Sequence, residues 1–231
     1  MSKRKIGDCV YCGLRAKLTL DHVPPAGLFG NPSPTDLIKV PSCFKCNGGA
    51  SRDDEYFKTV MVWKDRAGSH PEAVAIRSSV FRGLQMPQKT GFRHHLLRGM
   101  HLIRQRTPNG LYLGHREAFN VDLERLGRVV ARITKGLHWH HEGKRIPPTF
   151  EVSAFAEDGF REMSPWDQER IREQIVAPVF SGAHHSIGRG VMQYWYVRAT
   201  DRPEVSVWIY EFYQDVKFLA LVAPNPSTIV Q

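Results

Sequence analysis

The chain has 231 residues, 42% of them hydrophobic and 24% charged, which is enough for a small module and one domain of ordinary size. The formal charge of +9 and the isoelectric point near 9.6 favour an anionic partner. No apolar run approaches a membrane span, and Met1–Lys5 has no hydrophobic stretch behind its charges. We therefore exclude a membrane protein and expect a soluble, cytoplasmic one.

Four cysteines form two Cys-x-x-Cys pairs near the N-terminus, Cys9 with Cys12 and Cys43 with Cys46. Two such pairs can complete a tetrahedral thiolate site, so the pattern predicts a structural zinc ion. Thirty residues lie between the pairs, whereas an ordinary zinc ribbon has roughly 15–20. The zinc is therefore expected to hold together the base of a larger module. Disulfides are the weaker alternative, because an intracellular chain keeps its thiols reduced.

The segment between and after the cysteine pairs predicts two strands and a helix. Lys17–Leu20 alternates polar and apolar residues, which predicts a strand that stops after Asp21-His22-Val23, where two prolines follow. Leu37–Val40 predicts a second short strand, ending at the next proline. Apolar residues recur at helical spacing over Arg52–Trp63. Asp21-His22 then lies where the chain leaves the first strand, and Asn47 lies where it enters the helix. The two strands and the helix make a ββα unit.

Three motifs of this segment resemble the zinc-stabilised HNH endonucleases of the ββα-metal class, over about residues 6–63. The motifs are Cys9-x-x-Cys12, Leu20-Asp21-His22-Val23-x-Pro25 and Val40-Pro41-Ser42-Cys43-x-x-Cys46-Asn47. The resemblance implies that His22 is the general base that activates water for attack on a phosphodiester. It implies that Asp21 and Asn47 hold a catalytic divalent cation, Mg²⁺ or Mn²⁺. It also implies that the four cysteines hold a structural zinc away from the chemistry.

One position departs from the family pattern. The family often has an asparagine on the second strand, which helps to hold the loop that carries the base. Asp36 or Ile38 stands nearest to that place here, depending on the alignment. Asp36 could replace the asparagine as a hydrogen-bond acceptor but not as a donor.

The residue types suit phosphodiester hydrolysis without reference to the family. A cation stabilises the negative charge on the phosphate oxygens, and one carboxylate with one amide oxygen suits Mg²⁺ or Mn²⁺. Histidine titrates near neutral pH and can accept a proton from water. The alternative interpretation of Asp21-His22 is a surface dipeptide without a role.

Acidic residues and glycines at the start of the predicted helix have two interpretations each. Asp53, Asp54 and Glu55 would stabilise the positive end of the helix dipole, or Asp53 or Asp54 would add a metal contact beside Asn47. Gly48-Gly49 would either let the backbone approach a phosphate closely or form a flexible entry to the helix.

The rest of the chain predicts a second, basic domain. We expect an α+β fold with an N-terminal ββα-metal (HNH) zinc module, residues 1–66, followed by an α+β domain with an antiparallel sheet, residues 67–231, for binding DNA or a partner. The boundary lies near Arg66–Ser69. In chain order the expected elements are a helix over His70–Leu84, a hairpin of Met100–Arg106 and Leu111–His115 around Thr107–Gly110, helices over Leu123–Leu137 and Ser164–Val176, and strands over Met192–Ala199, Val205–Phe212 and Val216–Val222.

Basic residues are concentrated between Lys64 and Arg145, and four of them fall on one side of a predicted helix. These four, called the basic stripe below, are Arg125, Arg128, Arg132 and Lys135. Beside a nuclease-like site the basic stripe predicts a surface that follows nucleic-acid phosphates. The alternative is a solvated helix face.

Several histidines lack the cysteine or carboxylate neighbours of a metal site. They are His138, His140 and His141, the pair His184-His185 in a glycine-rich turn, and His94, His95 and His101 in the basic stretch. We expect loop or phosphate-facing roles for them rather than a second metal site.

The sequence thus predicts a metal-dependent DNA endonuclease with structural zinc and catalytic Mg²⁺ or Mn²⁺. RNA as the substrate, a homodimer and a partner in a defence complex are left open, as is a role in restriction or anti-phage defence. The alternative is a non-catalytic, zinc-containing protein that binds nucleic acid or forms a complex.

Overall fold

The computed structural model describes residues 6–64, 66–107, 109–160 and 163–226, so Met1–Lys5 and Pro108 lie outside the described residues. Helices and antiparallel sheets together confirm the α+β class. The chain forms two compact units, one of Met1–Ile76 with Leu123–Gln231 and one of Arg77–Asp122. This division differs from the predicted boundary near Arg66–Ser69.

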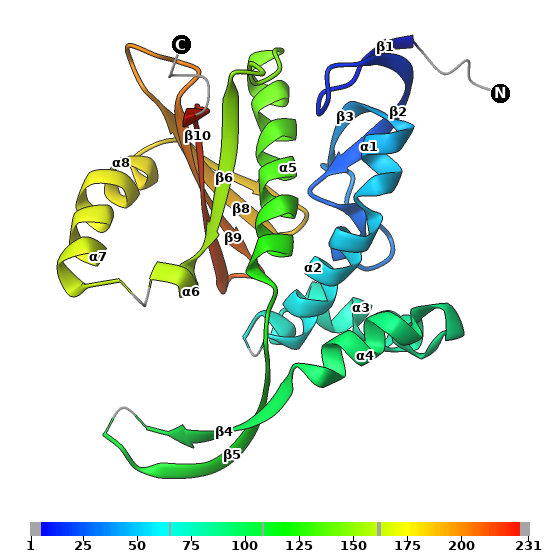
Figure 1. The fold of residues 1–231 in the computed structure, drawn as a ribbon, viewed down its shortest axis with the longest axis vertical. Helices are drawn as coiled ribbons and strands as arrows, with labels where there is room; N and C mark the ends of the chain where they lie inside the picture. The colour runs from blue at the N-terminus through cyan, green and yellow to red at the C-terminus, as the bar shows by residue number, and fades with distance from the viewer. Residues whose placement is uncertain (1–5, 65, 108, 161–162, 227–231) are drawn as a thin grey trace. The chain divides into compact units, whose positions relative to one another are not determined.

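The first unit begins with the part called the cysteine module below, residues 6–63 (Figure 1). It is an antiparallel sheet in the order β1-β2-β3, followed by two helices. The elements are β1 (Ile6–Asp8), β2 (Arg15–Val23), the short 3-10 helix η1 (Ala26–Leu28), β3 (Ile38–Cys43), α1 (Phe44–Gly49) and α2 (Ser51–Trp63). The predicted order of strand, strand and helix is confirmed.

One strand end differs from the sequence prediction. β2 ends at Val23, as predicted, and within it Asp21 and His22 pair with Val40 and Lys39. β3 does not end at Pro41 but continues to Cys43. Proline is tolerated there because β3 is an edge strand, and the Pro41 carbonyl accepts a hydrogen bond from the backbone N–H of Val10 at 3.0 Å.

The rest of the first unit is a long helix and a five-stranded antiparallel sheet in the order β6-β10-β9-β8-β7. The predicted strands β8, β9 and β10 and the predicted helices are confirmed, whereas β1, β6 and β7 were not foreseen. The elements are η2 (Ala67–Ser69), the start of α3 (Pro71–Gln85), α5 (Leu123–Glu142), β6 (Phe150–Ala156), α6 (Glu157–Phe160), α7 (Pro165–Ile171), the π-helical turn η4 (Arg172–Val176), α8 (Ala177–Phe180), β7 (His184–Ile187), β8 (Met192–Arg198), β9 (Ser206–Phe212) and β10 (Val216–Pro224).

The cysteine module and the five-stranded sheet share one core. The ring of Phe57, on α2, lies with its centroid 5.1 Å from that of Phe212 and 5.8 Å from that of Phe218. All three side chains are buried. The hydroxyl of Tyr213 donates to the carbonyl of Leu28 at 2.6 Å. Burial of these aromatic side chains holds the module on the sheet, which explains why both belong to one compact unit.

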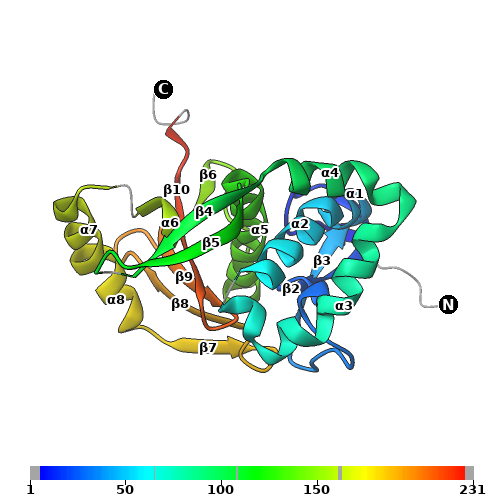
Figure 2. The same cartoon turned by 90° about the horizontal axis from the view of Figure 1, so that it is seen from below.

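Helix α5 lies beside α2 in both views and contacts the cysteine module and the sheet (Figures 1 and 2). Leu126, Val130, Ile133 and Leu137 recur at helical spacing and are buried. Gly136 allows a close approach to β2, because a Cβ there would lie 2.6 Å from a methyl carbon of Val23. The other face of α5 is polar.

Among the described residues, no helix is long and apolar enough to cross a membrane.

The second unit consists of the end of α3, η3 (Pro87–Lys89), α4 (Thr90–Arg98) and a hairpin of β4 (Met100–Arg106) with β5 (Tyr112–Phe119). The hairpin is confirmed, although β5 runs on to Phe119 instead of ending at His115. Helix α4 was not predicted. Figure 2 shows the two strands of the hairpin side by side.

Candidate metal centre and the neighbouring polar site

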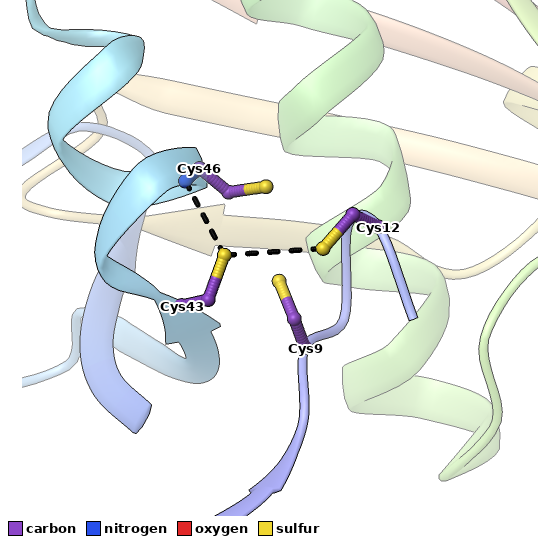
Figure 3. Close-up of side chains that lie close together, drawn as sticks. All are labelled: Cys9, Cys12, Cys43 and Cys46. Carbon is purple, nitrogen blue, oxygen red and sulfur yellow. Dashed lines mark hydrogen bonds between the residues drawn. The ribbon is translucent and has the colours of Figure 1, made fainter. Parts of the chain in front are cut away.

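The thiols of Cys9, Cys12, Cys43 and Cys46 converge on one point (Figure 3), with all four sulfur atoms within 4.8 Å of one another. The sulfurs of Cys12 and Cys43 are 3.8 Å apart. Four thiolates about 2.3 Å from a tetrahedral zinc ion lie about 3.8 Å from each other. All four cysteines are free thiols, so the weaker alternative of disulfides is not observed. The cluster could hold a metal ion such as zinc.

Local backbone structure positions both cysteine pairs. Gly13, with φ +75°, closes a tight turn after β1 in which its N–H donates to the Cys9 carbonyl at 2.8 Å. Cys43 caps the N-terminus of α1, where its sulfur accepts the backbone N–H of Cys46 at 3.4 Å. Burial opposes ionisation of Cys9, but backbone hydrogen bonds, including one from Cys12, outweigh it and lower the pKa of the Cys9 thiol to about 6. The thiolate is the form that binds a metal.

Asp21 is buried and held by one side chain from the turn between β1 and β2 and by one from α5. The hydroxyl of Tyr11 donates to its Oδ2 at 2.7 Å. Nε of Arg132, on α5, lies 3.5 Å from the same oxygen, and Arg132 also donates to Asp54 of α2 at 2.9 Å. Asp21 therefore takes part in an ion-pair network that joins β2 to α2 and α5, which the sequence did not indicate.

His22 is half-buried and follows Asp21 on β2. Side chains alternate along a strand, so Asp21 and Val23 share the face that contacts Arg132 and Gly136 of α5. The imidazole of His22 leaves the opposite face. Asp21 and His22 are thus neighbours along the strand but not on one face of it.

Asn47 lies on α1 and reaches β2. Its amide nitrogen donates to the hydroxyl of Thr19 at 3.0 Å and to the carbonyl of Leu20 at 3.3 Å. Thr19 is two residues before Asp21, so Asn47 reaches the face of β2 that carries Asp21. With the amide nitrogen engaged, the side-chain oxygen of Asn47 is the atom that suits a hard cation.

Gly48 and Gly49 lie in α1 rather than in a flexible segment. A Cβ at either position would meet nothing within 4 Å. Packing within the described structure therefore does not require glycine at these two positions, and close approach of a phosphate to this backbone stays a prediction.

Three of the four residues of the basic stripe are paired with carboxylates of α2. Asp53 binds Arg125 at 2.9 Å and Arg128 at 2.8 Å, and Asp54 binds Arg132. Only 17% of the Arg125 side chain and 13% of the Arg132 side chain are exposed. The helix prediction is confirmed, but the basic stripe packs along α2, with Lys135 half-buried on the same helix. Binding of phosphates by these residues stays untested.

Asp53 and Asp54 therefore bind arginines in this structure. Burial opposes ionisation of Asp53, but Arg128 and Arg125 outweigh it and hold the pKa of this carboxyl below its ordinary value. Burial raises the pKa of Asp54, although Arg132 acts in the other direction. Among the described residues, the cysteines form the one cluster of three or more histidine, cysteine or acidic ligands at metal-binding spacing.

Asp36 and Ile38, the two residues considered for the asparagine position on the second strand, have other partners in the structure. The carboxylate of Asp36 accepts the backbone N–H of Gly188 at 2.9 Å, so it joins the segment before β3 to the turn after β7. Ile38 pairs with Val23 at the end of β2.

The predicted loop histidines lie on regular elements instead. His138, His140 and His141 belong to α5, and His184 and His185 to β7. His141 Nε2 hydrogen-bonds to the hydroxyl of Tyr194 at 2.9 Å, and its ring lies 5.0 Å from that of His185. Burial, with the neighbouring His185 and His140, lowers the pKa of His141 to about 4. These rings are packed against the sheet, which local sequence did not show.

No family model, curated protein or solved structure matches the chain. The functional argument therefore rests on the residues and geometry described above.

Proposed function

We propose that this protein is a metal-dependent endonuclease that hydrolyses DNA phosphodiester bonds. The observation that carries the proposal is the hydrogen bonding of Asn47, which directly follows a cysteine of the metal cluster, to the strand that carries Asp21 and His22. One carboxylate, one amide and one imidazole thus occupy a short stretch of β2 and α1, beside a cluster that could hold zinc.

In this proposal each residue has a separate task. His22 accepts a proton from the attacking water. Asp21 and Asn47 would hold Mg²⁺ or Mn²⁺, which when bound supplies stabilisation of the negative charge on the phosphate. The cysteines hold a structural zinc, which fixes the start of α1 next to β2 and so keeps Asn47 in reach of the strand.

The alternation along β2 restricts where substrate can lie. Asp21 and His22 leave opposite faces of the strand, and β2 is the central strand between β1 and β3, so a phosphodiester that both residues serve has to lie at the Val23 end of β2. The Oδ2 atom of Asp21 is taken by Tyr11 and Arg132, which leaves its Oδ1 atom for a cation.

A second candidate function is a non-catalytic zinc protein that binds nucleic acid. The bonds from Tyr11 and Arg132 to Asp21 favour it, because they give this buried carboxylate a structural task. The two candidates differ in one outcome, which is cleavage of DNA by the intact protein.

The test is incubation of the zinc-loaded protein with supercoiled plasmid in Mg²⁺ or Mn²⁺, with omission of the divalent cation as the control. Omission is preferable to a chelator, which would also attack the cysteine site. The wild-type chain should nick or cut the plasmid, and His22→Ala should slow this by at least about 100-fold. His184→Ala is the matched control, since His184 is an exposed histidine on β7 and should leave cleavage unchanged.

Zinc content and circular dichroism establish that the His22→Ala variant is folded. Cleavage by that variant at the wild-type rate would remove His22 from the mechanism. Lack of cleavage by the wild-type chain with either cation, together with intact DNA binding, would establish the non-catalytic candidate.

A further inference from the structure

The positive charge of this protein is concentrated in its smaller unit. Residues 77–122 contain eight arginines and lysines against two acids, a formal charge of +6 out of +9 for the whole chain. The basic residues are Arg77, Arg82, Lys89, Arg93, Arg98, Arg104, Arg106 and Arg116, and the acids are Glu117 and Asp122. One fifth of the sequence therefore carries two thirds of its net charge.

The hairpin of β4 and β5, called the ribbon below, is exposed on both faces. Every residue of β4 is exposed, and the apolar residues of the ribbon share this exposure, with Leu102 66% and Leu113 55% accessible. A two-stranded ribbon is marginally stable in water by itself. Exposed side chains on both faces of such an element are typical of a surface that binds a partner.

One face of the ribbon carries two arginines, together with the acid Glu117, which pairs with Leu102. Arg104 pairs with His115 across the strands, and Arg106 pairs with Tyr112, so these four side chains share one face. The Tyr112 hydroxyl and Nδ1 of His115 are 2.9 Å apart, which fixes these two rings against each other. In the described part of the chain neither Arg104 nor Arg106 is in an ion pair, in contrast to Arg125, Arg128 and Arg132.

We propose that the ribbon binds duplex DNA in the major groove, with the Arg104 and Arg106 face toward the DNA. Unpaired guanidinium groups complement phosphates and guanine edges. The strands have seven and eight residues, which gives a length of roughly 25 Å. A two-stranded ribbon fits the major groove of B-form DNA, about 12 Å wide, but not the deep, narrow major groove of A-form RNA.

This inference concerns binding and does not depend on cleavage. It shares with the proposed function the choice of DNA as ligand. It also places the nucleic-acid contact on residues other than the basic stripe, whose arginines already neutralise the carboxylates of α2.

The test is fluorescence anisotropy with a labelled DNA duplex, without added divalent cation, so that cleavage does not interfere. Arg104→Gln/Arg106→Gln should weaken binding at about 100 mM salt by at least about tenfold. The slope of log affinity against log salt should become shallower by about one for each arginine that contacts a phosphate. The matched control is Lys144→Gln/Arg202→Gln, which removes two exposed cations from the other unit and should change affinity less than about threefold.

Three results would overturn the inference. The first is an equal loss of affinity in the ribbon variant and the control, which would reduce the effect to net charge. The second is equally tight binding of an RNA duplex of the same sequence. The third is a wild-type chain that sediments as a dimer, together with a Leu102→Ser/Leu113→Ser variant that is monomeric but binds DNA with unchanged affinity. That result would make the ribbon a contact with a second copy of this chain. Because the ribbon is exposed, circular dichroism should show the same fold for all variants.

Discussion

Replacement of Arg132 by glutamine is the most direct test of the contacts that join β2, α2 and α5. The guanidinium group of Arg132 donates to Asp54 at 2.9 Å, and its Nε lies 3.5 Å from Asp21. Both partners are acidic and mostly buried, with 22% and 8% of their side chains exposed. Without Arg132 two carboxylates remain close together, with no cation between them.

The size of the effect follows from the burial of these groups. Loss of one partner of a buried ion pair lowers the free energy of unfolding by about 3–5 kcal/mol. Because Asp54 is still partly exposed, we expect a loss near the lower end for Arg132→Gln, about 3 kcal/mol. Arg128 is the matched control one turn earlier on α5, because it also binds α2 but has 49% of its side chain exposed. Exposed ion pairs contribute less than about 1 kcal/mol, so Arg128→Gln should cost correspondingly little.

Urea unfolding, followed by circular dichroism, measures both variants. With a slope of about 2.5 kcal/mol per molar urea, the Arg132→Gln midpoint should fall by about 1.2 M. The double variant Asp54→Asn/Arg132→Gln should recover part of this loss, since it removes one of the unpaired carboxylates. Equal midpoints for Arg132→Gln and Arg128→Gln would refute the reasoning.

Three further predictions concern the metal cluster and two titrating groups. Cys43→Ser should abolish zinc binding and unfold the cysteine module, and elemental analysis that finds no zinc in well-folded wild-type protein would contradict this. The pKa of Asp53 lies below its ordinary value, so its charge contributes stability above about pH 4 that is lost as pH falls through the lowered pKa. In Asp53→Asn the urea midpoint should therefore fall less steeply than in the wild type as the pH is lowered from about 5 to about 2. The same steepness in both proteins would count against the ion pair. The ring of His141, with a pKa of about 4, stays neutral in the folded chain while the unfolded chain takes up a proton near pH 6.5. The free energy of unfolding should thus decrease as the pH is lowered from about 6.5 to about 4, and it should decrease less in His141→Gln. An NMR titration midpoint of His141 above about pH 6 would disprove the burial argument.

Local sequence patterns correctly predicted the elements whose signal is contained in neighbouring residues. The aromatic and β-branched residues of Met192–Arg198 and Ser206–Phe212 predicted two of the sheet strands, and the apolar spacing after Leu123 predicted α5. The cysteine spacing predicted a cluster with metal-binding geometry. In each case the physical cause, strand propensity, helical periodicity or the reach of a Cys-x-x-Cys turn, acts over a few residues.

Local patterns gave weaker signals for the elements that depend on a partner. β6 pairs with β10 from a distant part of the chain, and β7 pairs with β8 as an edge strand. His184 and His185 looked like turn residues because glycines precede and follow them, but the ladder to β8 makes them part of a strand. Strand formation here depends on the neighbour that supplies the hydrogen bonds.

The tertiary structure alone decided what the polar side chains contact. The sequence by itself determined that a four-cysteine cluster, an Asp-His dipeptide and a basic helix exist in this protein. It could not show that Arg125, Arg128 and Arg132 face Asp53 and Asp54, because the paired residues are 72 to 78 positions apart. Whether a charged side chain is paired or free is set by the packing of α2 against α5, since that packing alone brings opposite charges within hydrogen-bonding distance.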